Sequence, residues 1–235
     1  MKAFIMAAGN GTRLWPLTYS VPKCLLPIQG IPLLRVWLEN CKMAGITEVL
    51  VNVHGHAEQV RDFVKRQSNS VRIRIAEERD LLGSAGTLAE NRNFVRREAV
   101  FFVLYGDVLT NIALKDMLDF HTEKKVLATL GVCWVPDPSQ CGVVTFGGNH
   151  IVSSFVEKPA QPPSKWVFSG VMVASPTIFD FVPLHRPADI GFDLLPRMAG
   201  RMAAFPISAY LRDIGTMESY RAAQSSWPGL VQEAC

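Results

Sequence analysis

A glycine-rich segment near the N-terminus carries two cationic side chains that suit phosphate groups. Residues 7–13 read AAGNGTR directly after an apolar run, and Lys23 follows in a Pro-Lys pair. Glycines such as Gly9 and Gly11 let the backbone approach phosphate oxygens closely and adopt φ values that other residues resist. Arg13 offers a planar fork of donors, and Lys23 offers a point charge. The segment therefore predicts an anion site at the carboxyl end of a first strand.

The commoner phosphate-binding loops do not fit this segment. The dinucleotide fingerprint G-x-G-x-x-G requires a third glycine where the sequence has Leu14, and the next strand ends at residues 52–54 without an acid for a ribose. The P-loop pattern G-x-x-x-x-G-K-S/T is absent from the sequence. An ordinary glycine-rich turn with solvated cations has the same composition, so the segment alone leaves both interpretations open.

A candidate acid lies further along the chain. Asp107 follows the apolar run 100–104 and Gly106. In that place the side chain would project from the carboxyl end of a sheet strand into a cleft. An aspartate there is also a common cap of a helix or a turn. Its chemistry depends on which other residues the fold brings to the same edge.

Short apolar runs alternate with amphipathic stretches through the first half of the chain, and these elements must position the candidate residues. Strands joined by helices of this length need right-handed crossovers, which place them in a parallel sheet with helices on both faces. We therefore predict an α/β fold with a doubly wound, mostly parallel sheet. The predicted strands are 2–7, 48–53, 71–75, 100–104 and 126–132, and the predicted helices lie between Pro32 and Gly45, at 58–66, near 86–93 and near 114–124.

The second half of the chain has a different pattern, with shorter strands. The runs 143–146 and 151–156 flank a Gly-Gly-Asn turn, which predicts a hairpin. We interpret this half as an extension of the sheet that closes one side of a cleft. The prediction is one domain over residues 1–227, with two halves that meet near residue 125, and a tail over 228–235. The remaining predicted elements are a short strand at 171–173 and helices near 177–182, 192–200 and 216–227.

Composition excludes several classes of protein. Lysine and arginine number 24 against 21 aspartates and glutamates, and a net charge of +3 is too small to indicate a nucleic-acid or membrane partner. A hydrophobic fraction of 49% argues against disorder. The five cysteines are scattered without a C-x-x-C pair, so neither a disulfide framework nor a zinc site is indicated. The apolar runs are too short for a signal peptide or a membrane span, and we predict a cytoplasmic protein.

The segment GNGTRLWPLT at residues 9–18, followed by Pro22-Lys23, resembles the signature G-x-G-T-R-x-x-P-L-T…P-K of the sugar-1-phosphate nucleotidyltransferases, also called nucleoside-diphosphate-sugar pyrophosphorylases. One such motif is weak, but seven in the family's order make the resemblance specific. It implies a Rossmann-like, glycosyltransferase-A-like fold with a nucleotide-binding half over 1–125 and a sugar-binding half over 126–227. The other six motifs are LGSAGT (82–87), GD (106–107), GVV (142–144), VEKP (156–159), SGV (169–171) and DIGT (213–216).

The resemblance implies that a phosphate oxygen of a sugar 1-phosphate attacks the α-phosphorus of a nucleoside triphosphate and that pyrophosphate leaves. This chemistry needs positioning and charge neutralisation more than an acid or a base. The catalytic residues would be Arg13 on the β- and γ-phosphates, Lys23 over the α-phosphate, and Asp107. Asp107 and Asp213 would bind the cofactor Mg²⁺, a hard cation that keeps part of its hydration. The implied nucleotide-binding residues are Ala7, Ala8, Gly9, Gly11, Thr12, Arg13, Lys23, Glu78 and Gly83.

The same resemblance implies a set of residues for the sugar 1-phosphate. Glu157 would bind sugar hydroxyls, and Lys158 would bind the sugar phosphate. Adjacent strand residues face opposite sides of a sheet, so a local bend or the end of the strand must bring both side chains to the ligand. Gly142 and Gly170 would line the sugar pocket through their backbone. Asp193 is a further sugar-side candidate, with a helix N-terminal role as the alternative.

The sequence leaves the substrates open. The run at 81–94 and the chain length look most like bacterial mannose-1-phosphate or heptose-1-phosphate guanylyltransferases, which favours GTP with mannose 1-phosphate or a manno-heptose 1-phosphate. The alternatives are UTP, dTTP or CTP with another sugar phosphate, a cytidylyltransferase for a non-sugar phosphate such as phosphocholine, and an inactive nucleotide-sensing relative. The length fits a catalytic domain without the left-handed β-helix domain of larger relatives, and we expect a monomer or a homodimer.

Overall fold

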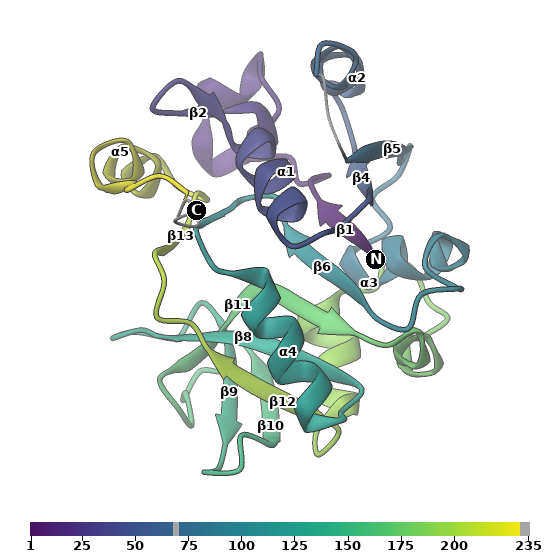
Figure 1. The fold of residues 1–235 in the computed structure, drawn as a ribbon. Helices are drawn as coiled ribbons and strands as arrows, with labels where there is room; N and C mark the ends of the chain where they lie inside the picture. Colours follow the sequence, from purple (N-terminus) through teal and green to yellow (C-terminus); the bar gives the residue numbers. More distant parts are fainter. Residues whose placement is uncertain (68–70, 231–235) are drawn as a thin grey trace.

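The computed structural model describes residues 1–67 and 71–230, and a nine-stranded sheet forms the centre of this part of the chain (Figure 1). Seven strands follow the order β10-β9-β11-β6-β1-β4-β5, while β8 pairs with β11 and with β12. The bounds of these strands are β1 (Lys2–Met6), β4 (Glu48–Val53), β5 (Arg72–Glu77), β6 (Phe101–Tyr105), β8 (Ala128–Trp134), β9 (Gly142–Phe146), β10 (Val152–Glu157), β11 (Trp166–Ala174) and β12 (Met202–Pro206).

The strands of the first half form the predicted doubly wound parallel sheet. β1 lies between β4 and β6 and is parallel to both, and β4 is parallel to β5. Along β1, Phe4 belongs to one buried cluster while Ala3 and Ile5 belong to another, so the two faces of the sheet bury different side chains. Trp37 and Leu88 come from helices on opposite faces. The helices are α1 (Leu33–Met43), α2 (Ala57–Lys65), α3 (Ser84–Glu90) and α4 (Leu114–Lys124).

The second half extends the sheet with strands of both directions. β11 is antiparallel to β6 and to β8, β10 is antiparallel to β9, and β12 is parallel to β8. The short strand predicted at 171–173 lies in the C-terminal half of the much longer β11, whose register shifts between Phe168 and Met172. β12 is absent from the prediction because its sequence, MAAFP, contains two alanines and a proline, which are rare in strands. The sheet as a whole stays mostly parallel.

Two of the predicted helices in the second half are irregular. The region near 177–182 is the 3-10 helix η5 (Pro176–Phe181). The region near 192–200 consists of the π-helical turn η6 (Ile190–Leu194) and the 3-10 helix η7 (Leu195–Met198). Pro196 lacks the N–H that an α-helix would need at this point, so a single regular helix cannot form.

The segment that follows β1 lies close to the C-terminal helix α5 (Met217–Ser226), as Figure 1 shows. Tyr220 Oη and Gln224 Nε2 both donate to the Pro27 carbonyl, at 2.8 and 2.7 Å. Helix α5 therefore packs against the segment with the candidate cations. This segment comprises the 3-10 turns η1 (Thr12–Leu14), η2 (Leu17–Tyr19) and η3 (Lys23–Leu25) and the hairpin of β2 (Pro27–Ile28) and β3 (Ile31–Pro32); a further turn, η4 (Arg92–Phe94), follows α3.

A short second sheet joins the two halves of the chain. β7 (Val108–Thr110), which directly follows β6, pairs antiparallel with β13 (Leu211–Asp213). Beyond α5, Trp227 is buried, and Asn111 Nδ2 donates to the Gly229 carbonyl at 3.2 Å. Residues 231–235 of the predicted tail lie outside the described residues. Within the described ranges, no helix has the length and apolar character needed to cross a bilayer.

Candidate active site

A cleft of about 1120 Å³ takes its walls from both halves of the chain. A smaller pocket of about 160 Å³ is lined by Ala7, Gly9 and Lys23 together with the segment 53–56. The ion pair between Lys23 and Asp107 joins this pocket to the cleft. The predicted site residues that line the cleft are Arg13, Asp107, Gly142, Glu157, Lys158, Gly170 and Asp213.

Asp107 and Asp213 are brought together by backbone pairing. Asp107 lies in the turn between β6 and β7, and Asp213, the last residue of β13, pairs with Val108. The Ile214 N–H donates to the Asp107 carbonyl at 2.8 Å. Lys23 Nζ lies 2.6 Å from Asp107 Oδ2. The fold thus collects the two predicted metal ligands and one predicted catalytic cation at the carboxyl end of β6.

The charges in this part of the cleft are only partly balanced. The cleft walls withdraw bulk water from the Asp213 carboxylate, and this desolvation, with the nearby Asp107 charge, raises its pKa although part of the side chain still meets solvent. Lys23 and Arg13 oppose the shift. The described residues place no third aspartate, glutamate, histidine or cysteine in a cluster with the pair. This donor set fits a hard divalent cation that completes its coordination with water and substrate oxygens.

The glycine-rich segment holds Arg13 at the surface. Gly11 has a φ of +62°, and Thr18 Oγ1 donates to its carbonyl at 2.8 Å. Leu14 is fully buried under the same turn, whereas Arg13 is exposed. A Cβ added at Gly9 would meet no atom within 4 Å, so the backbone there borders open space. Backbone and guanidinium are therefore both accessible to a phosphate.

The other predicted nucleotide-binding residues differ in exposure. Thr12 is exposed, Ala7 is half-buried, and Ala8 is buried. Glu78 is only 7% exposed, and its Oε2 accepts a hydrogen bond from the Leu82 N–H at 3.1 Å. Its carboxylate therefore lies beneath the segment predicted to read the base and does not line the cleft.

Gly83 lies where the two halves of the chain meet. Its φ is +75°, and a Cβ there would lie only 2.7 Å from the Ala188 nitrogen. The Ala85 N–H donates to the Ala188 carbonyl at 2.9 Å. Because only glycine combines this φ with this close approach, the segment is fixed against the second half of the chain.

Glu157 and Lys158 both face the cleft, although they are neighbours in sequence. Glu157 ends β10 opposite Gly142, and a Cβ on Gly142 would lie 2.6 Å from Glu157 Oε2. Lys158 has a φ of +47°, which is the local bend that two adjacent strand residues need to face one ligand. Its Nζ lies 5.8 Å from the centre of the Phe192 ring. Gly142 therefore makes room for the carboxylate, and the bend turns the ammonium toward the same space.

The cleft wall next to these residues depends on another glycine. Gly170, predicted to line the sugar pocket, has a φ of +80° and lies in the register shift of β11. A Cβ there would lie 2.9 Å from the Tyr105 Cβ. Burial raises the pKa of the Tyr105 phenol, so this side chain acts as a neutral part of the wall.

Asp189 and Asp193, two aspartates near η6, differ in their hydrogen bonds and in their position relative to the cleft. Asp189 Oδ1 accepts from the Gly191 and Phe192 N–H groups at 2.8 and 3.2 Å, and its Oδ2 accepts from Ser84 Oγ at 2.8 Å. Asp193 Oδ2 accepts from the Asp189 N–H at 2.7 Å, which completes a reciprocal cap. Asp189 lines the cleft and Asp193 does not. Asp193 thus takes part in a helix N-terminal cap, and its sugar-side role stays a prediction. The sequence analysis did not identify Asp189, whose partner Ser84 is distant in sequence.

The acids at this part of the cleft influence one another. Burial, and then the charge of Asp189, raise the pKa of Glu157, while Lys158 opposes the shift. Two carboxylates and one ammonium therefore share a partly desolvated wall. Carboxylates accept hydrogen bonds from hydroxyl groups, and an ammonium suits a phosphate.

Comparison with known proteins gives this arrangement a context. Residues 2–228 match the family model described as Nucleotidyl transferase. The chain belongs to this nucleotidyl transferase family. The mannose-1-phosphate guanyltransferase beta-A of Xenopus laevis is 34% identical over 226 residues, which are 94% of this chain and 62% of that protein. The chain thus spans less than two thirds of the length of that relative, and the resemblance to sugar-1-phosphate nucleotidyltransferases is confirmed.

Solved structures show the same fold. A putative glucose-1-phosphate thymidylyltransferase from Bacillus anthracis, in complex with a sucrose, has a TM-score of 0.85 and 24% identity, over 95% of this chain and 94% of that one. HddC from Yersinia pseudotuberculosis, complexed with GMP-PN, has a TM-score of 0.79 and 25% identity, over 95% and 97%. The Rossmann-like α/β fold expected of this nucleotidyl transferase is confirmed.

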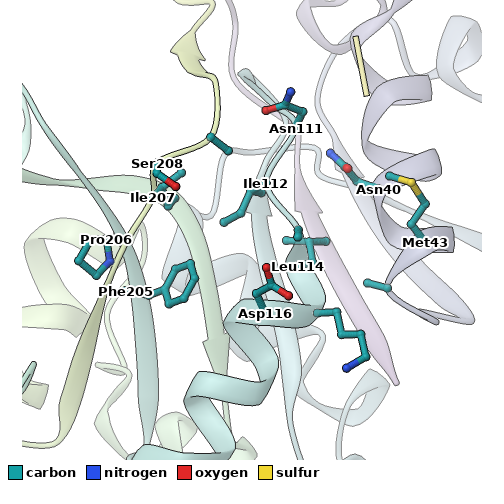
Figure 2. Close-up of a pocket in the computed structure, with 14 residues that line it drawn as sticks. Asn40, Met43, Asn111, Ile112, Leu114, Asp116, Phe205, Pro206, Ile207 and Ser208 are labelled. Atoms are coloured by element: carbon teal, nitrogen blue, oxygen red, sulfur yellow. The ribbon is translucent and has the colours of Figure 1, made fainter. Parts of the chain in front are cut away.

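A separate pocket of about 300 Å³ lies between the end of α1, the start of α4 and residues 205–209 (Figure 2). Ile207 and Ala209 line both this pocket and the cleft, so the two hollows lie back to back. None of the predicted site residues of this nucleotidyl transferase lines the pocket. The pocket therefore forms no part of the candidate active site.

Replacing Asp213 by asparagine should raise the thermal unfolding temperature when divalent cations are absent. The asparagine Oδ1 can keep the hydrogen bond from the Gly215 N–H, 2.7 Å long in the parent, and the repulsion between two carboxylates disappears. Mg²⁺ should then stabilise the parent and leave the variant unchanged. Calorimetry with and without Mg²⁺ measures both effects, and Asp119→Asn on the exposed face of α4 is the matched control. A parent that Mg²⁺ does not stabilise would contradict the metal assignment.

The variant Asp189→Asn should lower the pKa of Glu157. The substitution removes the neighbouring negative charge, while the asparagine oxygen can still accept from the Gly191 and Phe192 N–H groups. NMR titration of the glutamate carboxyl carbons measures the shift, and Asp193→Asn is the matched control that should leave the Glu157 pKa unchanged. An unaltered Glu157 pKa in Asp189→Asn would mean that burial alone raises it.

Proposed function

We propose that this chain transfers the guanylyl group of GTP to mannose 1-phosphate or a manno-heptose 1-phosphate and releases pyrophosphate. The observation that carries the proposal is that one cleft is lined by Arg13, Asp107 and Asp213 and also by Glu157 and Lys158. The first three residues suit a polyphosphate with its cation, and the last two suit a phosphorylated sugar. Two phosphorylated substrates would meet in this cleft.

On the nucleotide side, Arg13 would hold the β- and γ-phosphates and stabilise the departing pyrophosphate. Lys23 would neutralise the charge that builds on the α-phosphate during in-line transfer. Only 11% of the Lys23 side chain is exposed, and its ammonium lies 2.6 Å from Asp107 Oδ2. The ion pair supports this role because it holds the ammonium in place before substrate arrives, so little reorganisation is needed at the moment of reaction.

Asp107 and Asp213 would bind Mg²⁺. When bound, the cation would neutralise phosphate charge and orient the reacting phosphates. The raised pKa of Asp213 supports the assignment, because desolvation and the neighbouring carboxylate leave a surplus of negative charge that Lys23 and Arg13 only partly offset. Carboxylate oxygens are the protein ligands that Mg²⁺ prefers.

On the sugar side, Glu157 would accept hydrogen bonds from sugar hydroxyls and Lys158 would bind the sugar phosphate. Asp189, which also lines the cleft, offers a second carboxylate for the hydroxyls. The attacking group is a phosphate oxygen that is already ionised near neutral pH, so the chain needs no general base to activate it. The work of the site is then alignment of two anionic substrates.

The choice of GTP and a manno-configured sugar rests on the relatives. The Xenopus laevis protein is named as a mannose-1-phosphate guanyltransferase, and the HddC structure contains GMP-PN. UTP, dTTP and CTP stay open as alternatives, and a UTP--glucose-1-phosphate uridylyltransferase of Synechocystis is 33% identical over 213 residues. Base choice on this fold rests on a few hydrogen bonds near Gly83.

A cytoplasmic location is part of the same proposal. The four cysteines within the described residues are free thiols, which is typical of a reducing compartment. A monomer or a homodimer stays a prediction, and analytical ultracentrifugation distinguishes the two states.

The proposed function predicts that the purified protein with Mg²⁺ releases pyrophosphate from GTP only when the sugar 1-phosphate is present. A matrix of GTP, ATP, UTP, CTP and dTTP against a panel of sugar 1-phosphates tests the choice of both substrates. Asp107→Asn should reduce turnover by about 100-fold, because it weakens both the cation site and the anchor of Lys23, whereas Asp119→Asn should not. Folded protein without turnover in any combination would contradict the proposal.

Lys158→Ala should raise the KM for the sugar 1-phosphate by about tenfold while the KM for the nucleotide changes little, because it removes one charged contact to the sugar phosphate. Steady-state kinetics with each substrate varied in turn separate the two constants. Lys165→Ala is the matched control: this exposed lysine lies over Trp134 and does not line the cleft. An unchanged KM in Lys158→Ala would place the sugar phosphate elsewhere.

A further inference from the structure

A cluster of buried polar side chains lies directly beneath the proposed nucleotide site. Asn52 is 4% exposed, Glu78 is 7% exposed, and Thr87 is 1% exposed. These residues come from the end of β4, from the segment after β5 and from α3. Buried polar groups cost free energy unless they are hydrogen-bonded, so each contact of the cluster needs an explanation.

The Asn52 amide joins three separate segments of the chain. Its Oδ1 accepts from the Ala7 N–H at 2.7 Å. Its Nδ2 donates to Glu78 Oε1 at 2.8 Å and to Thr87 Oγ1 at 3.2 Å. Since β1 ends at Met6, the first of these bonds holds the first residue of the phosphate-binding segment. The acceptor and donor ends of one amide thus fix different elements.

Glu78 connects Asn52 to the segment that would face the base. Its Oε1 also accepts from Thr87 Oγ1 at 2.5 Å, and its Oε2 accepts from the Leu82 N–H at 3.1 Å. The donors from Asn52, Thr87 and Leu82 are all uncharged groups. A buried carboxylate that is stabilised by neutral donors depends strongly on each of them.

The segment 82–83 is also held in place on the side that faces the second half of the chain. Gly83 lies against the Ala188 backbone, which leaves no room for the segment to move away from Glu78. The Thr87 N–H donates to the Gly83 carbonyl at 2.8 Å. The segment 82–83 is therefore held from below by Glu78 and from the side by the second half of the chain.

We propose that Asn52 is a positioning residue for the nucleoside triphosphate and that it acts through Glu78. The chain of hydrogen bonds from Ala7 through Asn52 and Glu78 to Leu82 sets the separation between the phosphate-binding segment and the segment that faces the base. The inference rests on the proposed function for its substrate. It places Glu78 beneath the base, where the carboxylate supports the backbone of 82–83 and does not contact the base itself.

Exchanging the two polar groups tests the proposal. Asn52→Asp removes both amide donors and sets a second carboxylate against Glu78. In the double variant Asn52→Asp/Glu78→Gln, the amide introduced at position 78 donates to the carboxylate at position 52, and its oxygen accepts from the Leu82 N–H. The hydrogen bond between positions 52 and 78 is then restored with its direction reversed, while the Ala7 and Leu82 N–H groups donate as before.

Calorimetric titration with GTP and Mg²⁺, or with the triphosphate that the parent binds most tightly, measures the effect. Asn52→Asp should weaken nucleotide binding by about tenfold or more, while the Kd for the sugar 1-phosphate stays within about twofold. The double variant should return the nucleotide Kd to within about threefold of the parent. If the double variant binds as poorly as Asn52→Asp, the proposal is overturned in favour of direct base contact by the Glu78 carboxylate. Equal weakening toward both substrates would overturn it as well.

A pair of threonine variants separates positioning from general stability. Thr87 and Thr129 are both buried, and the Thr129 hydroxyl bonds to His121 Nδ1 at 2.9 Å, away from the cleft lining. Thr87→Val should raise the nucleotide Kd, whereas Thr87→Ser, which keeps the hydroxyl, should have a Kd close to that of the parent. Thr129→Val should lower the unfolding temperature and leave the nucleotide Kd unchanged. Equal effects of the two valine variants on nucleotide binding would overturn the proposal. Because binding is measured without turnover, a parent that binds nucleotide but transfers nothing would contradict the proposed function and leave this test intact.

Discussion

The antiparallel pairing of β7 with β13 is the contact on which the rest of the site depends. It joins strands that are about 100 residues apart in the sequence and sets Asp213 beside the turn that carries Asp107. A ladder of three residues has little stability of its own. Leu109 and Ile214, both buried, pack with Trp227 in a cluster that also includes the β2–β3 hairpin residue Ile28. Apolar packing therefore stabilises the approach of two carboxylates that would otherwise repel each other.

The fold places acidic side chains near one another and partly away from water, although both conditions disfavour their charged forms. Asp213 and Glu157 both have pKa values raised by desolvation and by a nearby acid. Glycines provide the space, since a side chain at Gly142 or Gly191 would overlap the Glu157 carboxylate. Functional sites commonly retain such local conflicts because the surrounding structure compensates for them. In the proposed function, two anionic substrates and a cation would occupy the cleft. The cation would offset the surplus negative charge of Asp107 and Asp213.

Much of the fold could be predicted from the sequence where local pattern and burial agree. β4 and α4 have the predicted bounds, because EVLVNV is rich in valine, which favours strands, and α4 has an amphipathic period. The alanine-containing β12 and the irregular η6 and η7 could not be predicted, since pairing with β8 and a proline decide them.

The same contrast holds for the site. Arg13, Lys23, Asp107 and the Glu157-Lys158 pair stand in short motifs. The structure gathers all of them around one cleft except Lys23, which lines the adjoining pocket and pairs with Asp107. Asn52 and Asp189 have no such motif, because their partners Glu78 and Ser84 are 26 and 105 residues away. Hydrogen bonds between distant segments leave no local pattern. Glu78 was singled out by its position shortly before the LGSAGT motif, but its burial beneath the segment 82–83 needed the three-dimensional structure.

The attachment of α5 to the β2–β3 hairpin also bears on the order in which the molecule is made. Gln29 N–H donates to Gln224 Oε1 at 2.8 Å across a separation of 195 residues, and Gln29 Nε2 donates to the Trp227 carbonyl. A ribosome synthesises the glycine-rich segment well before α5, because the two are far apart in the sequence. During translation the glycine-rich segment is therefore present before α5 and Asp213 have been synthesised. A nascent chain that stalls before β13 carries Arg13 and Lys23 but cannot assemble the acid pair, so assembly of this pair requires synthesis through β13.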